Sequence, residues 1–342
     1  MKIVKHVLKL TAYTPGEQPK AKKVVKLNTN ENPYPPSPAC ARVLRTFDLD
    51  GLRRYPDPVF TDLRAALAKL NRCRPEQIFV GNGSDEILAL AARCFVENDE
   101  AIASLDPSYS LYKTLADIRN VRWIGADPAK RLPKNVSLFL WTNPNAPTGE
   151  FAEPKALAAF AGKFRGVLLI DEAYADFART NCMALAAART NRNILVMRTF
   201  SKSYSLAGLR VGYCVGPVDL IDALYKIKDS YNADAVAQRV ALAAVKDQKT
   251  MKAHVLKIIR TRTAFTKALV RRGWDVLPSE SNFVFAKPPS PNTAAALFDA
   301  LRARHIYVRY FTGPKTADRL RITIGTDSQM KTLLKAIDEL SV

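Results

Sequence analysis

Histidine is scarce in this chain of 342 residues, and its five cysteines form no recognisable pattern. The three histidines, His6, His254 and His305, lie far apart in the sequence, which argues against a histidine metal site and against a Ser-His-Asp triad. The cysteines are odd in number and include no C-x-x-C pair, so we expect neither a disulfide framework nor a zinc site. Buried free thiols are the simpler interpretation. The cysteines are Cys40, Cys73, Cys94, Cys182 and Cys214.

Long apolar runs are also absent. No stretch approaches the roughly 20 apolar residues that a membrane-spanning helix needs. The N-terminus begins with basic residues but has no sustained apolar core and no small-residue cleavage site, so the sequence predicts no secretory signal. We therefore expect a cytoplasmic enzyme that does not contact a membrane.

Negative charge is under-represented, because 32 Asp and Glu residues stand against 52 Lys and Arg residues and leave a net charge of +20. A basic protein attracts anions, including nucleic acids and phosphorylated metabolites. The cations are spread along the chain, and the densest cluster, residues 20–23, is short. We expect no nucleic-acid partner, and instead a basic surface around a site for small anionic ligands.

The length and the 48% hydrophobic content predict two packed domains. Residues 14–38 are rich in Pro, Lys and Asn, which indicates an extended arm with one short strand at 23–27. We expect residues 1–40 to form an N-terminal arm that packs on the small domain. Residues 41–235 are then the large domain, and 236–342 the small C-terminal domain.

Strand and helix patterns alternate from residue 78 onward. The strands are continuous apolar runs, which is typical of a mostly parallel sheet covered on both faces. Beyond residue 235, one helical stretch to about 272 precedes short strands and helices, which indicates a smaller α+β domain. The fold class is therefore α/β. Strands are expected at 78–80, 101–103, 137–141, 167–170 and 194–197, with helices at 60–70, 86–95, 154–164 and 183–189.

Ligands of open α/β sheets gather at the carboxyl ends of the strands, so we expect the site among the residues that follow each strand. Four groups of polar or small residues follow strands. In the first, Gly81–Glu86, the small residues and a helix N-terminus suit a phosphate. An ordinary helix N-cap at Ser84 or Asp85 is the alternative. The G-x-G-x-x-G dinucleotide pattern is not met, because Glu86 occupies its last position. The groups are Gly81–Glu86, Asn143–Gly149, Asp171–Tyr174 and Thr199–Gly212.

The third and fourth groups contain the reactive side chains, whereas the second predicts a rigid or plain turn. Asp171 ends a buried strand, where a carboxylate is costly without a partner. That partner is either a cationic ring nitrogen or a structural ion pair. A lysine that forms a Schiff base needs its neutral amine, which burial favours, and Lys202 lies beside the sheet end. Ser201 and Arg210 are placed to hold a phosphate near it, and a solvated lysine is the alternative.

In this order and spacing the groups resemble the fold-type I pyridoxal-phosphate (PLP) enzymes, the aspartate aminotransferase superfamily. They are most similar to the branch that contains the histidinol-phosphate aminotransferases. The resemblance covers nearly the whole chain and implies a three-layer PLP-transferase fold with pyridoxal 5'-phosphate as cofactor. The stretches that carry it are residues 27–34, 54–57, 83–87, 106–109, 143–149, 171–174, 198–212 and 320–325.

The resemblance also implies roles for individual residues. Lys202 binds the cofactor as a Schiff base and shuttles a proton, and Asp171 keeps the pyridine nitrogen protonated so that the ring accepts electrons. Tyr174 hydrogen-bonds the 3-oxygen of the ring, and Tyr109 lies against its face. Tyr55 reaches the phosphate of a neighbouring subunit's cofactor, which implies a homodimer. The remaining cofactor contacts are Gly83, Ser84, Asp85, Asn143, Ser201 and Arg210.

One position departs from the family. Asn usually stands immediately before Pro-Thr-Gly and contacts the 3-oxygen, whereas this chain has Ala146 there. Asn143 and Asn145 are near in sequence, and the sequence leaves open whether either compensates.

For the substrate, the resemblance implies that Arg321 clamps a carboxylate, since its planar fork suits bidentate binding. Arg309 and Tyr13 lie at the substrate phosphate, and Asn30 belongs to the same site. The expected reaction belongs to histidine biosynthesis and converts L-histidinol phosphate and 2-oxoglutarate to imidazole acetol phosphate and L-glutamate.

Two other enzymatic functions remain open at this point, and a regulatory one is disfavoured. An aromatic amino acid aminotransferase and an L-threonine-O-3-phosphate decarboxylase share these motifs and differ in which substrate bond breaks. A PLP-sensing, DNA-binding regulator would carry an additional N-terminal domain. The PLP pattern starts near residue 27, which leaves no room for one.

Overall fold

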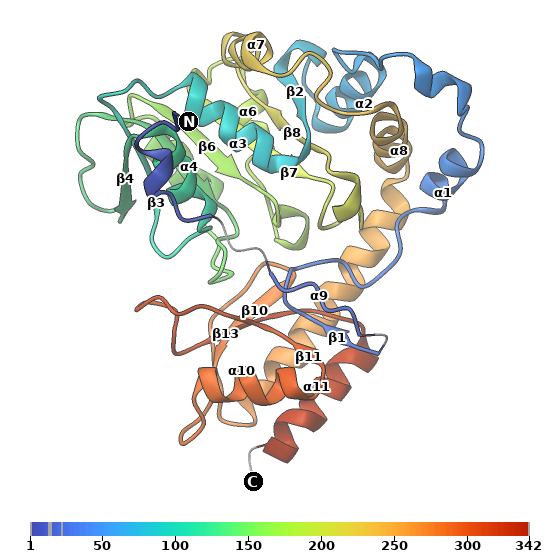
Figure 1. The fold of residues 1–342 in the computed structure, drawn as a ribbon, viewed down its shortest axis with the longest axis vertical. Coiled ribbons are helices and arrows are strands. Elements are labelled where there is room, and N and C mark those ends of the chain that lie inside the picture. Colours follow the sequence, from blue (N-terminus) through green and yellow to red (C-terminus); the bar gives the residue numbers. More distant parts are fainter. Residues whose placement is uncertain (1, 13–15, 22, 341–342) are drawn as a thin grey trace.

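The computed structural model describes residues 2–12, 16–21 and 23–340. It divides into a larger part around a seven-stranded sheet and a smaller part around a four-stranded sheet (Figure 1). The long helix α9, Gln248–Val270, runs from the larger part into the smaller one. Among the described residues, no helix is both long and apolar enough to cross a membrane.

The large sheet has the strand order β2-β8-β7-β6-β5-β3-β4. Its pairs are parallel except that β8 runs antiparallel to both β2 and β7. The predicted α/β class with a mostly parallel sheet is confirmed, although β4 and β8 were not predicted. The strands are β2 (Ile78–Gly81), β3 (Ala101–Leu105), β4 (Arg122–Ala126), β5 (Val136–Thr142), β6 (Val167–Asp171), β7 (Ile194–Thr199) and β8 (Gly212–Val215).

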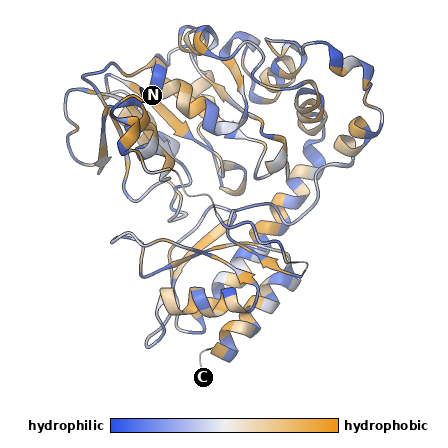
Figure 2. Cartoon of the chain, in the orientation of Figure 1, coloured by the Kyte–Doolittle hydropathy of each residue, from blue (hydrophilic) through white to orange (hydrophobic). Residues whose placement is uncertain are grey.

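Helices cover both faces of this sheet. Successive side chains of a strand point to opposite faces, so each central strand packs against both helix layers. Leu168 and Ile170 of β6 belong to one apolar cluster, and Leu169 belongs to the other. The first cluster includes residues of α2, α5 and α8, and the second those of α3, α4 and α7. Figure 2 shows apolar residues along the strands between these layers. The helices are α1 (Pro38–Arg45), α2 (Thr61–Asn71), α3 (Gly83–Cys94), α4 (Leu111–Arg119), α5 (Pro154–Ala161), α6 (Met183–Ala187), α7 (Val218–Ile227) and α8 (Ala235–Lys246).

The smaller part is an antiparallel sheet of order β12-β13-β10-β9 with helices against it. A separate parallel pair joins β1 to β11. The elements of the smaller part are β1 (Val25–Lys26), β9 (Asp275–Val276), β10 (Phe283–Lys287), α10 (Ala294–Ala303), β11 (Ile306–Tyr307), β12 (Arg309–Tyr310), β13 (Leu320–Thr323) and α11 (Asp327–Leu340). Short 3-10 helices cover Val7–Lys9, Asp50–Arg53, Pro75–Gln77, Ala175–Phe177 and Ala207–Leu209.

The N-terminal segment contacts both parts. Val25 pairs with Ile306 in the parallel β1–β11 pair. Further toward the N-terminus, His6 Nε2 lies 3.2 Å from the carbonyl oxygen of Ile118 on α4. The strand is shorter than the expected 23–27. The domain boundaries at residues 40 and 235 stay a prediction.

The single helical stretch expected between 235 and 272 is wrong, because two helices meet at Asp247. The backbone of Asp247 leaves the helical region, with φ −105° and ψ 65°. Its carboxylate accepts hydrogen bonds from the backbone N–H and the hydroxyl of Thr250, at 3.2 and 2.7 Å. A carboxylate that accepts hydrogen bonds from the first turn of a helix caps its N-terminus. Asp247 therefore starts α9 as a helix separate from α8.

A buried ion network joins β7 to the segment after β6. Arg198 donates to Glu172 at 2.9 and 3.0 Å and to Asp176 at 2.8 Å. The side chain of Glu172 is 0% exposed and that of Arg198 is 13% exposed. Burial opposes the charge of Arg198, but Glu172 and Asp176 outweigh it and raise the pKa of the guanidinium. The network therefore ties β7, which precedes Lys202, to the segment directly after Asp171 at the end of β6.

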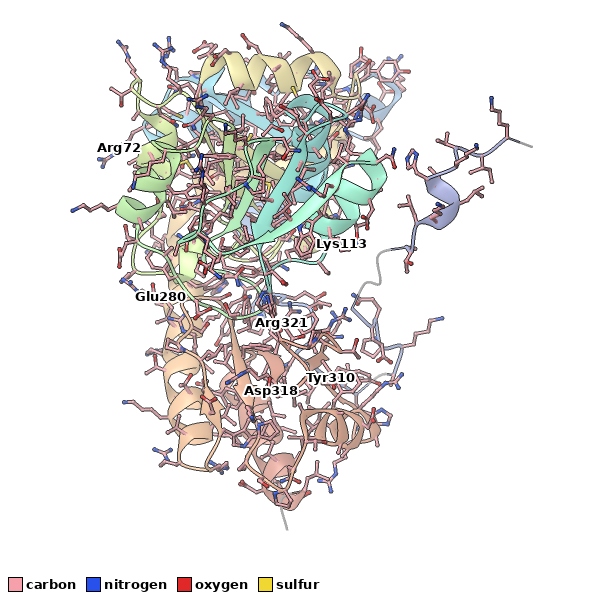
Figure 3. The ribbon with its side chains drawn as sticks, turned by 90° about the vertical axis from the view of Figure 1, so that its left-hand side faces the viewer. Arg72, Lys113, Glu280, Tyr310, Asp318 and Arg321 are labelled. Atoms are coloured by element: carbon pink, nitrogen blue, oxygen red, sulfur yellow. The ribbon has the colours of Figure 1, made fainter. Side chains whose placement is uncertain are left out.

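Removing one partner of this network is expected to destabilise the fold strongly. Glu172→Ala leaves a buried guanidinium without its main carboxylate, which should lower the free energy of unfolding by about 3–5 kcal/mol. The matched control is Asp117→Ala, which breaks an exposed pair with Lys113 on α4 and should cost less than about 1 kcal/mol. Figure 3 shows Lys113 on the outer side of the larger part. Urea unfolding of both variants checks the difference, and equal losses would contradict this stabilising role of the network.

Candidate active site

A cavity of about 410 Å³ lies where the larger part meets the smaller part and the N-terminal arm. The parallel strands and β2 all end at this edge of the sheet, so the segments that follow them meet here. Figure 3 shows Arg321 of β13 at the junction of the two parts. The predicted site residues that line the cavity are Asn30, Ser84, Asp85, Tyr109, Asp171, Tyr174, Ser201, Lys202, Arg210, Arg309 and Arg321.

Lys202 follows β7 and points into this cavity. Its Nζ donates to the carbonyl oxygen of Thr29 at 3.1 Å and lies 5.8 Å from the centroid of the Tyr174 ring. Burial of the amine, followed by the positive charge of Arg321, lowers the pKa of Lys202 to about 8. A far larger fraction of this amine is therefore neutral near pH 8 than of an exposed lysine, as a nucleophile requires.

Asp171, the last residue of β6, is buried at the floor of the cavity. It accepts hydrogen bonds from the Tyr112 hydroxyl at 2.8 Å and from the backbone N–H of Ala173 at 3.0 Å. Burial outweighs these bonds and raises the pKa of Asp171 to about 6. A cation in the cavity would favour the ionised carboxylate, since an opposite charge nearby lowers the pKa of an acid.

Sequence reasoning missed Tyr112 as a partner of Asp171. It is fully buried on α4, and its hydroxyl also lies 2.6 Å from Thr142 Oγ1. Its ring packs edge-on against Tyr109, with centroids 5.6 Å apart. Tyr109 precedes α4, which begins at Leu111, so no helical spacing in the sequence marks Tyr112 as a partner of Asp171.

Small residues and an arginine form an anion cradle at the end of β2. Gly83 has a φ of +77°, and a Cβ added to it would lie 2.6 Å from Arg210 Nη2. A Cβ on Gly212 would lie 2.7 Å from the backbone nitrogen of Ser84. Arg210 Nη1 also lies 3.3 Å from Ser201 Oγ. Only glycines allow the arginine and the α3 backbone to approach this closely.

The alternative of a cap at Ser84 or Asp85 is wrong. Helix α3 begins at Gly83 with Asn82 as its cap residue, so Ser84 and Asp85 lie in the first turn. The N–H groups of a first turn have no partner within their helix and carry the positive end of its dipole. Both residues line the cavity, so their backbone suits a phosphate there.

The two asparagines near Ala146 are both engaged outside the cavity. Asn143 exchanges two hydrogen bonds with the backbone of Ala152, at 2.8 and 2.9 Å. The amide of Asn145 binds Pro107 O and Thr148 Oγ1, each at 3.0 Å, and accepts from the Ser108 hydroxyl at 2.9 Å. Ala146 itself lines the cavity and brings no hydrogen-bonding side chain.

Two arginines face the cavity from neighbouring strands of the small sheet. Arg309 and Arg321 are cross-strand partners, and both lie over the ring of Phe311, at 5.4 and 5.3 Å. Arg321 also donates to the carbonyl oxygen of Asn28 at 2.7 Å. The guanidinium groups are thus held at fixed positions on aromatic faces, where they add positive charge to the cavity wall.

The other predicted site residues lie elsewhere. Gly83 lies under Arg210, and Asn143 faces Ala152, as described above. Tyr13 lies outside the described residues. Tyr55 is 79% exposed and stacks on Tyr231 with centroids 4.3 Å apart, away from this cavity. Its expected contact concerns a second subunit and stays a prediction.

The cysteines and the acidic residues add no second centre. All five cysteines are free, with Cys40, Cys182 and Cys214 buried. Burial raises the pKa of Cys73 to about 11, so this thiol is protonated at neutral pH. In the described part of the chain, no group of His, Cys, Asp and Glu is arranged to hold a metal ion.

Comparison with known proteins agrees with this geometry. Residues 22–337 match the family of class I and II aminotransferases. The histidinol-phosphate aminotransferase of Geobacter sp. strain M21 is 43% identical over 98% of this chain and 97% of its own. The PLP complex of the Sinorhizobium meliloti histidinol-phosphate aminotransferase superposes with a TM-score of 0.87, at 25% identity over 99% and 98% of the two chains. The L-threonine-O-3-phosphate decarboxylase of Porphyromonas gingivalis has a TM-score of 0.82 at 23% identity over 93% and 99%, which reflects the shared fold.

A lysine of lowered pKa, a buried carboxylate and an arginine beside a helix N-terminus line one cavity at the carboxyl edge of a mostly parallel sheet. The chain belongs to the class I and II aminotransferase family. Within that family, the curated relatives that it matches over nearly their full length include histidinol-phosphate aminotransferases at 41–43% identity.

The residues of the cavity fit pyridoxal 5'-phosphate. Because Gly83 and Gly212 lack a Cβ, the Arg210 guanidinium and the backbone nitrogen of Ser84 can approach these two positions closely, which brings a cation and a helix N-terminus together. Asp171 offers a buried carboxylate that a protonated ring nitrogen would partner. Lys202 offers an amine that is partly neutral near pH 8. These groups lie in one cavity, which is the arrangement that a phosphorylated pyridine aldehyde requires.

Proposed function

We propose that this chain transfers the amino group of L-histidinol phosphate to 2-oxoglutarate and forms imidazole acetol phosphate and L-glutamate, with pyridoxal 5'-phosphate as cofactor. The observation that carries the proposal is the single cavity that holds Lys202, Asp171, the α3 cradle and two arginines. The near-full-length identity to histidinol-phosphate aminotransferases supports the choice of substrates.

Each residue has a separate task in this proposal. Lys202 would bind the cofactor through its amine and would move a proton at the substrate carbon. Asp171 keeps the ring nitrogen protonated, and Tyr112 holds the carboxylate in place. Ser84, Ser201 and Arg210 bind the cofactor phosphate. The bound cofactor supplies the electron sink that stabilises negative charge at the substrate carbon.

Arg309 and Arg321 are proposed to bind the substrates in turn. One half-reaction brings a phosphate ester without an α-carboxylate, and the other brings a dicarboxylate. Guanidinium forks bind both kinds of oxyanion bidentately, so one pair of cations can serve both. Their fixed positions over Phe311 avoid the entropy cost of ordering long side chains at each turnover.

A homodimer and a cytoplasmic location complete the proposal. Tyr55 is exposed on the face that carries Tyr231, which is 44% exposed. A second subunit that covers this face would place its bound cofactor close to Tyr55 of the first subunit. Analytical ultracentrifugation tests the dimer.

The lowered pKa of Lys202 predicts how fast the apoenzyme captures its cofactor at different pH values. Only the neutral amine attacks the cofactor aldehyde, and the pKa of Lys202 is about 8. The capture rate should therefore rise about tenfold per pH unit below pH 8 and level off above it. Stopped-flow absorbance from pH 6 to 10 measures this rate. A rate that still rises tenfold per unit between pH 9 and 10 would contradict the lowered pKa.

The test of the function is a single-turnover assay. The cofactor-loaded protein is mixed with L-histidinol phosphate, L-phenylalanine or L-threonine phosphate, and the cofactor spectrum is followed. Rapid conversion to the pyridoxamine form by L-histidinol phosphate, with phenylalanine much slower, supports the proposal. Conversion mainly by phenylalanine would make the protein an aromatic aminotransferase, and carbon dioxide released from threonine phosphate would make it a decarboxylase.

A further inference from the structure

A chain of buried hydrogen bonds connects β13 to Tyr174 through Asn30. The backbone N–H of Asn30 donates to Thr323 Oγ1 at 3.0 Å, and that hydroxyl donates to Asn30 Oδ1 at 2.9 Å. The amide Nδ2 of Asn30 then donates to the Tyr174 hydroxyl oxygen at 2.9 Å. Asn30 is 1% exposed, Thr323 2% and Tyr174 8%, so water has little access to compete for these bonds.

The backbone of Asn30 is held as firmly as its side chain. Its φ is +56°, in the left-handed region that asparagine tolerates better than most residues. Its carbonyl oxygen accepts from Asn282 Nδ2 at 2.9 Å. Contacts to β13 and to the segment before β10 therefore determine where its amide points.

The direction of these bonds follows from the partners. Thr323 accepts the backbone N–H of Asn30 and uses its one hydrogen on Asn30 Oδ1. If the amide were turned over, two donors would converge on the same hydroxyl, and its hydrogen would lose the acceptor that it has. An unsatisfied buried donor is costly, so the amide presents its N–H to Tyr174.

The hydrogen of Tyr174 consequently points away from Asn30. A hydroxyl that accepts a bond on one side is free to donate on another, and Tyr174 lines the cavity. Its ring stands edge-on against Phe283, with centroids 5.1 Å apart and an angle of 89°, so it has little freedom to turn. Burial raises the pKa of Tyr174, which keeps its hydrogen in place at neutral pH.

The neighbouring cavity wall does not provide a substitute. Ala146 has no polar side-chain atom, and Asn143 and Asn145 are engaged with Ala152, Pro107 and Thr148. We propose that Asn30 is a positioning residue that turns the Tyr174 hydroxyl into a hydrogen-bond donor toward a negatively charged oxygen on the cofactor ring. The inference rests on the proposed function, because it presumes that pyridoxal 5'-phosphate occupies the cavity.

The inference predicts how the bound cofactor titrates. A donor at the ring oxygen spreads its negative charge, so losing the donor makes the adjacent Lys202–cofactor linkage hold its proton more tightly. Asn30→Ala should raise the apparent pKa of the chromophore by about half a unit to one unit. Thr323→Val should shift it in the same direction by less. Absorbance of the loaded protein between pH 5 and 10 measures both.

Two further variants test the direction and the route. Asn30→Asp keeps the shape of the side chain but replaces the donor with an acceptor that draws the Tyr174 hydrogen toward itself. The apparent pKa of the chromophore in this variant should therefore rise at least as far as it does in Asn30→Ala. Tyr174→Phe should raise the pKa most, and adding Asn30→Ala to it should change nothing more, because Asn30 acts through Tyr174. Asn135→Ala, on an exposed loop, is the control and should titrate like the parent protein.

Each outcome separates the inference from the function on which it rests. If Asn30→Asp and Thr323→Val fold, as thermal unfolding would show, and titrate like the parent protein, the positioning role is overturned even if Asn30→Ala fails to fold. Additive shifts from Asn30→Ala and Tyr174→Phe would overturn it too. If the parent protein forms no chromophore that depends on Lys202, the proposed function itself is wrong.

Discussion

Lys202→Ala is expected to abolish covalent attachment of the cofactor and to lower turnover by at least about 10⁴-fold. General acid–base catalysis alone contributes about 10²–10⁴-fold, and in the proposed function this side chain also supplies the amine that binds the cofactor. No other described lysine lines the cavity, so no neighbour replaces it. The loss should appear in kcat more than in KM, because Arg309 and Arg321, which we propose bind the substrates, remain.

Absorbance spectra after addition of pyridoxal 5'-phosphate, together with steady-state rates, measure this effect. The matched control is Lys163→Ala, an exposed lysine beyond the end of α5 that should leave both unchanged. Turnover within tenfold of the parent protein would remove Lys202 from the mechanism. Circular dichroism separates a chemical loss from a folding defect.

Asp171→Asn is expected to slow turnover by about 10²–10³-fold while the cofactor still binds. The substitution keeps the size of the side chain and an acceptor for the Tyr112 hydroxyl, but it removes the negative charge. A preorganised group that stabilises developing charge typically contributes a factor of this size. Without the carboxylate, the ring nitrogen loses the partner that favours its proton, and the electron sink weakens.

Single-turnover rates with L-histidinol phosphate, alongside fluorescence titration of cofactor binding, test this role. Asp99→Asn, at an exposed turn, provides the control for removing one negative charge. A near-normal rate would show that Asp171 is structural. If the substitution raised the Kd of the cofactor by a larger factor than it lowered the single-turnover rate, Asp171 would anchor the cofactor ring and not tune its electronic properties.

The central sheet and the reactive residues could be predicted from local patterns. Continuous apolar runs such as 167–170 are buried on both faces, and that pattern is visible in a single segment. Because parallel strands end at the same edge, Asp171 and Lys202 could be assigned to one site from their positions after two strands. The small residues of Gly81–Glu86, followed by a helix, predicted a phosphate site at the position where the cradle lies.

Other features could not be predicted, for different physical reasons. The break at Asp247 depends on one carboxylate that turns back to Thr250, and the helical pattern continues on both sides of it. The edge strand β4 is only partly buried, so it lacks the apolar run that marks the central strands. Tyr112 became a partner of Asp171 only because α4 packs against the carboxyl edge of the sheet.

The sequence by itself determined the fold class and the family of the protein and predicted the chemistry of Lys202, because each depends on residue types at short spacing. Only the tertiary structure decided which amide reaches Tyr174. Asn30 is 144 residues from Tyr174 and 293 from Thr323 in the sequence. The direction of a hydrogen bond depends on the partners that surround it in space, and residues this far apart become partners only when the arm, the small sheet and the large sheet pack together.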